Sequence, residues 1–247
     1  MRYFLELSYN GKDYHGWQIQ PDAISVQEVL ENAMSTLLKT KIALVGAGRT
    51  DTGVHAQQMY AHFDVDHAID NQDLVYKLNS FLPKDIAVHN IFEVKPEAHA
   101  RFDALSRTYL YRIALKKDVF NFDAAYLIKQ DLDVDEMNKA TKILFEYKDF
   151  QCFSKTHTDV KTYICDIMKA EWTRVGHELH FVIQADRFLR NMVRAIVGTL
   201  VNVGLHKIEA EDVHRIIASK DRGEAGYSVP AQGLYLTQID YPESIKI

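Results

Sequence analysis

The chain has 247 residues, of which 47% are hydrophobic and 26% are charged, and its formal net charge is −5. These are ordinary values for a globular protein, and the length suffices for one large domain or two small ones. No apolar run approaches a membrane span, and the N-terminal segment reaches Glu6 too early for a signal-peptide core, so we expect a cytoplasmic protein that does not enter a membrane.

The first half of the sequence predicts a mixture of strands and helices. In chain order they are a strand over 3–9, a helix over 26–37, strands over 42–47 and 54–64, a helix over 71–81 and a strand over 86–95. Ser25 and Glu28 form a capping-box pattern at the start of the first helix. The second helix must end before Pro83, because the residue preceding a proline resists the helical conformation.

The second half repeats this alternation loosely. It predicts a strand over 107–115, a helix over 134–146, strands over 160–174 and 178–186, helices over 188–203 and 209–218, and a strand over 234–240. Val175-Gly176-His177 is expected as the turn between the two long strands. Gly204 is the C-cap candidate of the strongly apolar helix.

The order of these elements indicates the fold class. Strands and helices do not alternate strictly as βαβ units, which favours α+β halves, each a mostly antiparallel sheet with helices on one face. We expect a first domain over residues 1–104 and a second over 105–247. Cys152 and Cys165 lack the spacing of metal ligands and are expected as buried thiols in a reducing compartment.

Basic residues gather in two stretches in spite of the negative net charge. The first contains Arg101, Arg107, Arg112, Lys116 and Lys117, and the second contains Arg187, Arg190 and Arg194. A basic face on an acidic body would bind phosphates. Ordinary solvated faces would give the same composition, so charge alone does not decide between them.

The most informative stretch is the small-residue loop Gly46-Ala47-Gly48-Arg49-Thr50-Asp51-Thr52-Gly53, which is followed by Val54-His55-Ala56. Glycines permit a positive φ or a close approach of the backbone, and site residues concentrate on loops between rigid elements. A dinucleotide-binding fingerprint would need a glycine at Asp51, and a P-loop would need a lysine after Gly53. The loop is therefore neither a dinucleotide-binding fingerprint nor a P-loop. Taken alone, it could be a functional site or an ordinary tight turn with a solvated Asp–Arg pair.

The loop resembles the Gly-Arg-Thr-Asp-Ala-Gly-Val-His-Ala signature of the tRNA pseudouridine synthase A family. Further blocks that resemble this family lie before and after the loop, in the family's order and along nearly the whole chain. They are Tyr9-Asn10-Gly11, Gly16-Trp17-Gln18-Ile19-Gln20, Ser25-Val26-Gln27, Leu82-Pro83-Lys84-Asp85-Ile86, Ala100-Arg101-Phe102-Asp103-Ala104, Phe188-Leu189-Arg190-Asn191-Met192-Val193-Arg194 and Pro230-Ala231-Gln232-Gly233-Leu234. Thr52 departs from the usual alanine, and residues 148–153 follow the usual His-Asp-Phe-Ser-Ser-Phe only partly.

The resemblance implies an enzyme that isomerises uridine to pseudouridine at positions 38, 39 and 40 of the tRNA anticodon stem-loop. It implies the pseudouridine synthase fold, with the sheets of two α+β halves joined around a central cleft, and a homodimer that shares one tRNA. The reaction breaks the C1′–N1 bond, rotates the base and rejoins it through C5. Because this involves no redox change, phosphate transfer or hydrolysis, no metal, nucleotide or other cofactor is expected.

Asp51 is the residue that the family motif places as the catalytic carboxylate, either as the nucleophile or as the base. The sequence leaves these two mechanisms open. Arg49 can be interpreted as an ion-pair partner that stabilises the loop, or as a substrate-binding residue that holds phosphate or fills the space of the extruded base. We favour the substrate role, because a base in a stem must be flipped out before its ribose can be reached.

Three further substrate-binding residues come from the second half. Arg194 lies on the apolar helix, where an unpaired charge would be costly, and the resemblance suggests Asp51 as its partner, which would favour the ionised carboxylate. Tyr109 shares a strand face with Tyr111 and matches the family's substrate-stacking tyrosine, whereas Tyr111 is expected in the core. Leu234 matches the apolar residue on the far side of the base, although its periodicity alone predicts a core position.

Two rival functions fit parts of the sequence. A non-catalytic RNA-binding module of the same fold would have no reason to keep Asp51 beside RNA phosphates. A carboxylate glycosidase needs a second acid, and the only nearby motif carboxylate, Asp103, is expected to be structural. Zinc-dependent base deamination is excluded, because no Cys-x-x-Cys pair is present. His177 and His180 are not expected to bind metal, and Trp17 could be buried or contact RNA.

Overall fold

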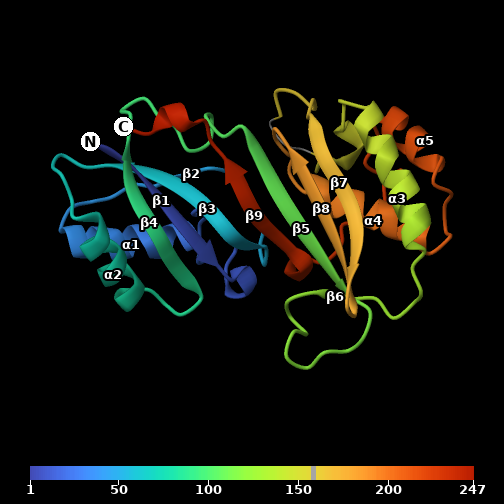
Figure 1. Cartoon of the computed structure of the whole chain (residues 1–247), viewed down its shortest axis with the longest axis horizontal. Helices are drawn as coiled ribbons and strands as arrows, with labels where there is room; N and C mark the ends of the chain where they lie inside the picture. The colour runs from blue at the N-terminus through green and yellow to red at the C-terminus, as the bar shows by residue number, and fades with distance from the viewer. Residues whose placement is uncertain (157–159) are drawn as a thin grey trace. The chain divides into compact units, whose positions relative to one another are not determined.

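The computed structural model describes residues 1–156 and 160–247, which group into two compact units (Figure 1). The first unit comprises Met1–Leu105 together with Tyr235–Ile247, and the second comprises Ser106–Leu234. Each unit combines a sheet with helices, so the predicted α+β class is confirmed.

The first unit contains a mostly antiparallel sheet in the order β4-β1-β3-β9, with the short β2 beside β3. Its strands are β1 (Arg2–Tyr9), β2 (Val45–Gly46), β3 (His55–Asp64), β4 (Ile86–Val94) and, from Tyr235 on, β9 (Leu234–Asp240). β1 runs antiparallel to both neighbours, whereas β9 joins β3 in parallel through the pairs His55–Tyr235 and Ala56–Leu236. The last strand therefore belongs with the N-terminal elements, although its place in the sequence groups it with the second half.

Both faces of β1 are covered. Tyr3, Leu5 and Leu7 alternate on one face and are buried. Phe4 on the opposite face is buried as well, because the rings of Tyr241 and Phe92 pack against it at centroid distances of 5.3 and 5.9 Å. The C-terminal segment thus supplies part of the core of the first unit.

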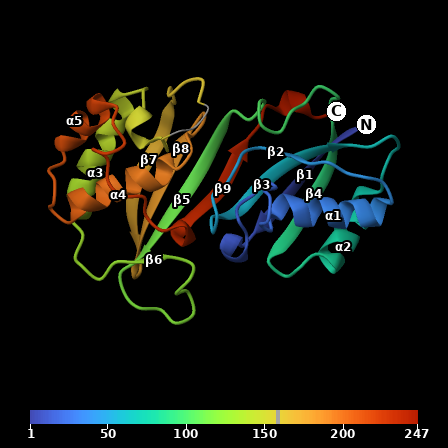
Figure 2. The same cartoon turned by 180° about the vertical axis from the view of Figure 1, so that it is seen from behind.

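Two helices, α1 (Val26–Leu38) and α2 (Asn71–Phe81), lie on one face of this sheet (Figure 2). The Ser25 hydroxyl accepts the Glu28 backbone N–H at 3.3 Å, which confirms the predicted N-cap. α2 ends as predicted, with Leu82 in an extended conformation before Pro83.

The second unit contains the antiparallel sheet β5-β8-β7, with β6 parallel to the end of β5. Its strands are β5 (Ser106–Ala114), β6 (Tyr126–Leu127), β7 (Ile167–Val175) and β8 (Glu178–Ala185). The helices α3 (Val134–Ile143), α4 (Met192–Gly204) and α5 (Asp212–Ser219) gather on one face of this sheet (Figure 2). Gly176 forms the predicted turn between β7 and β8 with φ +60°.

The strand predicted over 160–174 is shorter in the structure. Residues 157–159 lie outside the described part of the chain, and β7 begins only at Ile167. The residues before it bond to a preceding loop, because Phe150 donates its N–H to the Tyr163 carbonyl and Cys165 donates to the Lys148 carbonyl. These backbone groups are satisfied outside the β7–β8 ladder, so the strand prediction was wrong over 160–166.

The ends of several predicted helices also differ. α4 begins at Met192 rather than at 188, because Asn191 has the left-handed φ of 67° and interrupts the helix there. The predicted C-cap at Gly204 was wrong, since Gly204 is the last helical residue and Leu205 is the cap. Gly204 is instead a packing residue, because a Cβ there would lie 2.5 Å from the Met137 sulfur. α5 begins at Asp212 rather than at 209.

His62 on β3 gives the stability of the protein an expected pH dependence. Its ring is buried, and Nδ1 accepts the Ala100 N–H at 3.1 Å. Burial, followed by the charges of Arg2 and His99, lowers the pKa of His62 from 6.5 to about 4. The unfolded chain therefore binds a proton between these pH values that the folded chain excludes. We expect acidification through this window to lower the free energy of unfolding by up to about 3 kcal/mol.

Urea denaturation of the wild type and of His62→Asn at neutral pH and near the lower pKa would measure this contribution. The asparagine oxygen can accept the Ala100 N–H without titrating, so the variant should lose less stability on acidification. An equal loss in both proteins would show that other groups carry the pH dependence.

Candidate active site

Asp51 lies half-buried in the loop between β2 and β3, and backbone hydrogen bonds fix the chain on both sides of it. Trp17 donates its N–H to the Thr50 carbonyl at 3.4 Å, and Val54 donates to the Asp51 carbonyl at 3.1 Å. Gly53 takes the positive φ of 78° that this turn requires. The backbone that bears the Asp51 carboxylate is therefore fixed by hydrogen bonds on both sides.

Two tyrosines of the N-terminal segment add to this support. The Tyr9 hydroxyl and the Thr50 hydroxyl are hydrogen-bonded at 2.9 Å. Gly53 donates its N–H to the Tyr14 carbonyl at 3.2 Å, and the Tyr14 hydroxyl donates to the Asp85 carboxylate at 2.8 Å. The segment around residues 9–17 therefore forms a cradle for the loop.

The cradle depends on close approach at two glycines. Gly16 has φ +88°, and a Cβ there would lie 2.2 Å from the Thr50 carbonyl oxygen. A Cβ on Gly46 would lie 2.3 Å from Trp17 Nε1, and Trp17 is only 2% exposed. Trp17 is therefore a buried support of the loop, which decides between the two interpretations left open by the sequence.

His55 connects the end of the loop to β9, a role that the sequence did not reveal. Its Nδ1 accepts the Gly11 N–H at 3.1 Å, and its ring stacks on Tyr235 with centroids 4.6 Å apart. In the sequence, the only sign of this role was a histidine next to apolar residues at the start of a predicted strand.

The Arg49 side chain is exposed on the loop that bears Asp51 and is accessible to a ligand.

Tyr109 lies on β5, opposite Ile183 of β8, and is half-buried. Its ring packs edge-on against Phe188 at a centroid distance of 5.2 Å and an angle of 90°. Phe188 belongs to a motif block but had no assigned role; it fixes the orientation of the tyrosine ring. Tyr111 is fully buried and donates its hydroxyl to the Pro230 carbonyl at 2.8 Å, which confirms its predicted core position.

Arg194 is half-buried in the first turn of α4. Its Nε donates to the Val229 carbonyl at 2.7 Å, and Val229 donates its N–H to the Arg194 carbonyl at 3.3 Å. The segment that orients Arg194 is itself tied to α4 by a 2.6 Å bond from Asn191 to Ser228. Leu234, at the start of β9, is 6% exposed. The pairing of Arg194 with Asp51 stays a prediction.

Similarity to known proteins shows the family to which a chain with these site residues belongs. A family model described as tRNA pseudouridine synthase matches residues 7–103 and 144–242. The chain belongs to the tRNA pseudouridine synthase family. The resemblance inferred from the sequence motifs is confirmed, and with it the enzyme class, an isomerase.

Curated relatives named tRNA pseudouridine synthase A cover almost the entire chain. The relative from Parabacteroides distasonis is 53% identical over 99% of this chain and 97% of its own. The relative from Bacteroides thetaiotaomicron is 52% identical over 99% of this chain and 92% of its own. The relative from Geobacter sp. is 41% identical over 97% of this chain and 98% of its own.

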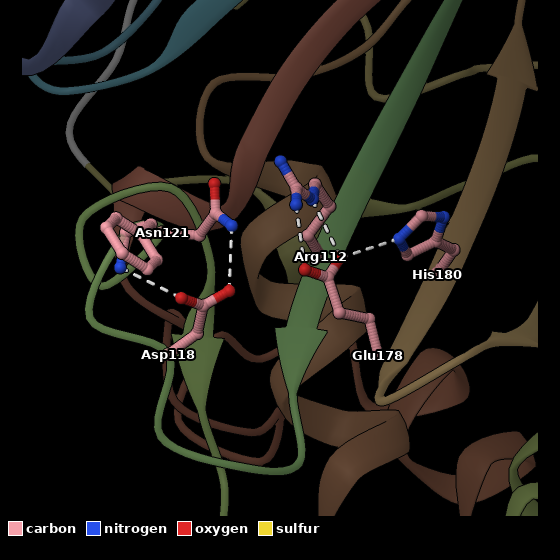
Figure 3. Close-up of polar contacts among 6 residues, drawn as sticks. Arg112, Asp118, Asn121, Glu178 and His180 are labelled. Atoms are coloured by element: carbon pink, nitrogen blue, oxygen red, sulfur yellow. Dashed lines mark hydrogen bonds and ion pairs between the residues drawn. The ribbon is translucent and has the colours of Figure 1, made fainter.

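In this member of the tRNA pseudouridine synthase family, part of the basic stretch is engaged internally. Arg112 binds the Glu178 carboxylate through two hydrogen bonds of 2.9 and 2.7 Å, and His180 Nε2 lies 2.8 Å from the same carboxylate (Figure 3). Arg107 donates to the Asp186 carbonyl at 2.8 Å. Lys116 and Lys117 remain exposed. The basic residues expected to face phosphates are therefore fewer than the sequence suggests.

The two thiols and the Asp103 carboxylate of this tRNA pseudouridine synthase family member are buried or hydrogen-bonded within the protein. Cys152 and Cys165 are buried free thiols, as predicted, and burial raises the pKa of each to about 12. The Asp103 carboxylate accepts the His99 N–H at 2.7 Å, as suits a structural residue. Among the residues that the structure describes, no cluster of His, Cys, Asp or Glu could hold a metal ion. Within the same ranges, no helix is both long and apolar enough to cross a membrane.

Proposed function

We propose that this chain isomerises uridine to pseudouridine in tRNA, at positions 38, 39 and 40 of the anticodon stem-loop. The proposal is based on the half-buried Asp51 in a loop that hydrogen bonds fix in place. The family match covers this loop and the segments before and after it. The named relatives supply the substrate class, and the uridine positions come from the motif resemblance.

Asp51 is proposed as the catalytic carboxylate. It either attacks C1′ as the uracil leaves through N1, or stabilises charge at C1′ and assists proton removal. In both cases the C1′–N1 bond breaks, a C1′–C5 bond forms, the proton at C5 is lost and N1 gains one. A rigid loop favours this chemistry, because the carboxylate can be held in reach of C1′ without further ordering.

The remaining residues are proposed to bind the flipped-out uridine. Tyr109, whose ring is oriented by Phe188, stacks on the uracil, and Leu234 contacts its far side. Exposed Arg49 binds phosphate or fills the space of the extruded base. Arg194, oriented by the Val229 carbonyl, holds Asp51 ionised. We further propose that the protein is cytoplasmic and works as a homodimer on tRNA.

Tritium release from tRNA labelled at C5 of uridine tests the reaction directly, because each isomerisation liberates that hydrogen. Pseudouridine mapping in total tRNA after deletion of the gene tests the positions. Loss of pseudouridine at 38, 39 and 40 alone is expected. Intact pseudouridine at all three positions would contradict the assignment.

Isomerisation consumes no co-substrate, so activity should need no added metal, nucleotide or reductant. We expect dialysis against EDTA to leave single-turnover tritium release unchanged when the tRNA is kept folded by a polyamine. Loss of activity that zinc or another transition metal restores, while magnesium does not, would contradict this expectation.

A further inference from the structure

The loop between β5 and β6 exposes an unusual amount of apolar surface. Within four residues, Val119, Phe120 and Phe122 are 64%, 89% and 66% exposed. We call residues 116–122 the aromatic loop. Clustered large apolar side chains at the surface mark interaction sites more often than single ones do. The described active-site residues lie on other segments, so this surface has no role in the proposed chemistry.

The tip of the aromatic loop is held in shape by its own side chains. The Asp118 carboxylate accepts the Phe120 backbone N–H and the Asn121 side-chain amide, both at 2.8 Å (Figure 3). These hydrogen bonds lower the pKa of Asp118 and keep it ionised. A preformed turn reduces the ordering cost when Phe120 contacts a partner.

The charge of the aromatic loop is compatible with a polyanion. Lys116 and Lys117 are exposed directly before the turn, on a chain whose net charge is −5. The Asp118 charge is directed into the turn, and the nearby Arg112 is matched by Glu178. Exposed aromatic rings beside lysines are the combination that binds unpaired nucleotides, through stacking on bases and contacts with phosphates.

We propose that the aromatic loop binds unpaired bases of the RNA substrate, with Phe120 and Phe122 stacking on bases and Lys116 and Lys117 contacting phosphates. The inference rests on the proposed function, because it takes tRNA as the substrate. A second copy of the chain is a poorer occupant. A contact in which this loop packs on the same loop of a second copy would bring the lysine pairs of both copies together.

Substitution of the rings tests the proposal. Phe120→Ala is expected to weaken the binding of tRNA, and to raise KM, about tenfold, the effect of losing one base stack. The kcat at saturating tRNA and the melting temperature should not change, because the ring is 89% exposed. Tyr76→Ala on α2 is the matched control, since Tyr76 is 74% exposed and lies outside the loop. Its affinity for tRNA should equal that of the wild type.

The chemistry of the contact is tested by replacing the ring in two ways. Phe120→Trp should keep the affinity, and its fluorescence should be quenched by an anticodon stem-loop but not by a duplex of equal length. The native Trp17 and Trp172 are both 2% exposed and give a constant background. Phe120→Leu keeps an apolar side chain without a π-face and should bind as weakly as Phe120→Ala.

Three results would overturn the inference. Wild-type affinity of Phe120→Ala would show that the ring does not contact RNA, and wild-type affinity of Phe120→Leu would show a contact other than stacking. Dissociation of an oligomer in Phe120→Ala, seen by light scattering, would assign the loop to a protein interface. Direct titration separates this inference from the proposed function, since RNA binding by the loop can be measured even if the wild type releases no tritium.

Discussion

Replacing Asp51 with asparagine is expected to lower pseudouridine formation by at least about a thousandfold, while tRNA affinity stays the same or increases. The amide has nearly the shape of the carboxylate but cannot act as nucleophile or base. It also removes a negative charge beside RNA phosphates, so binding should not suffer. Tritium release and filter binding with the same tRNA measure the two effects separately.

Asp103→Asn is the matched control for this substitution. Asp103 is also a motif carboxylate of the first unit, but its oxygen accepts the His99 N–H, which an amide oxygen can do as well. This variant should retain nearly full activity. Turnover by Asp51→Asn within tenfold of the wild type would remove Asp51 from the chemistry, whatever Asp103→Asn does.

Gly16→Ala should disable the enzyme although Gly16 contacts no reacting atom. The new Cβ would lie 2.2 Å from the Thr50 carbonyl oxygen, at a residue whose φ of +88° already disfavours alanine. The loop must shift to relieve this contact, and a displacement of about 1 Å at a catalytic group can cost about a hundredfold in rate. We expect such a loss of kcat together with a destabilisation of about 2 kcal/mol or more.

Gly176→Ala separates the effect of the contact from that of the backbone strain. Gly176 also has a positive φ, +60°, but no atom beyond its two chain neighbours lies within 4 Å of the position that a Cβ would take there. This variant should lose only about 1–2 kcal/mol and keep its activity. Urea denaturation and tritium release compare the two proteins. Equal losses of stability and unchanged activity in Gly16→Ala would show that the loop does not depend on this close approach.

The elements with the clearest periodicity could be predicted from the sequence. The range of β9 was predicted residue for residue, as was that of α2. What the sequence could not provide was the partner of β9, because parallel pairing with β3 depends on contacts between distant segments. The start of α4 was missed for a local reason. Asn191 adopts a left-handed conformation that apolar periodicity does not reveal.

The candidate site residues could be predicted because they lie in family motifs, and not because of their periodicity. The family motif predicts Asp51 and Tyr109 as site residues, whereas spacing alone would assign Leu234 to the core and the glycine loop to an ordinary turn. The support of the loop required the structure. Gly16 and Trp17 occur in motif blocks, but only their distances to Thr50 and Gly46 show that they hold the loop.

The return of β9 to the first unit has a consequence for synthesis on the ribosome. The N-terminal segments emerge first, yet His55 stacks on Tyr235, and Phe4 is covered by Tyr241. These contacts must wait until nearly all of the 247 residues have been translated. During elongation, the nascent first unit therefore carries an open strand edge at β3 and an uncovered aromatic cluster. The loop that bears Asp51 acquires its full support only after β9 has been translated and has joined β3.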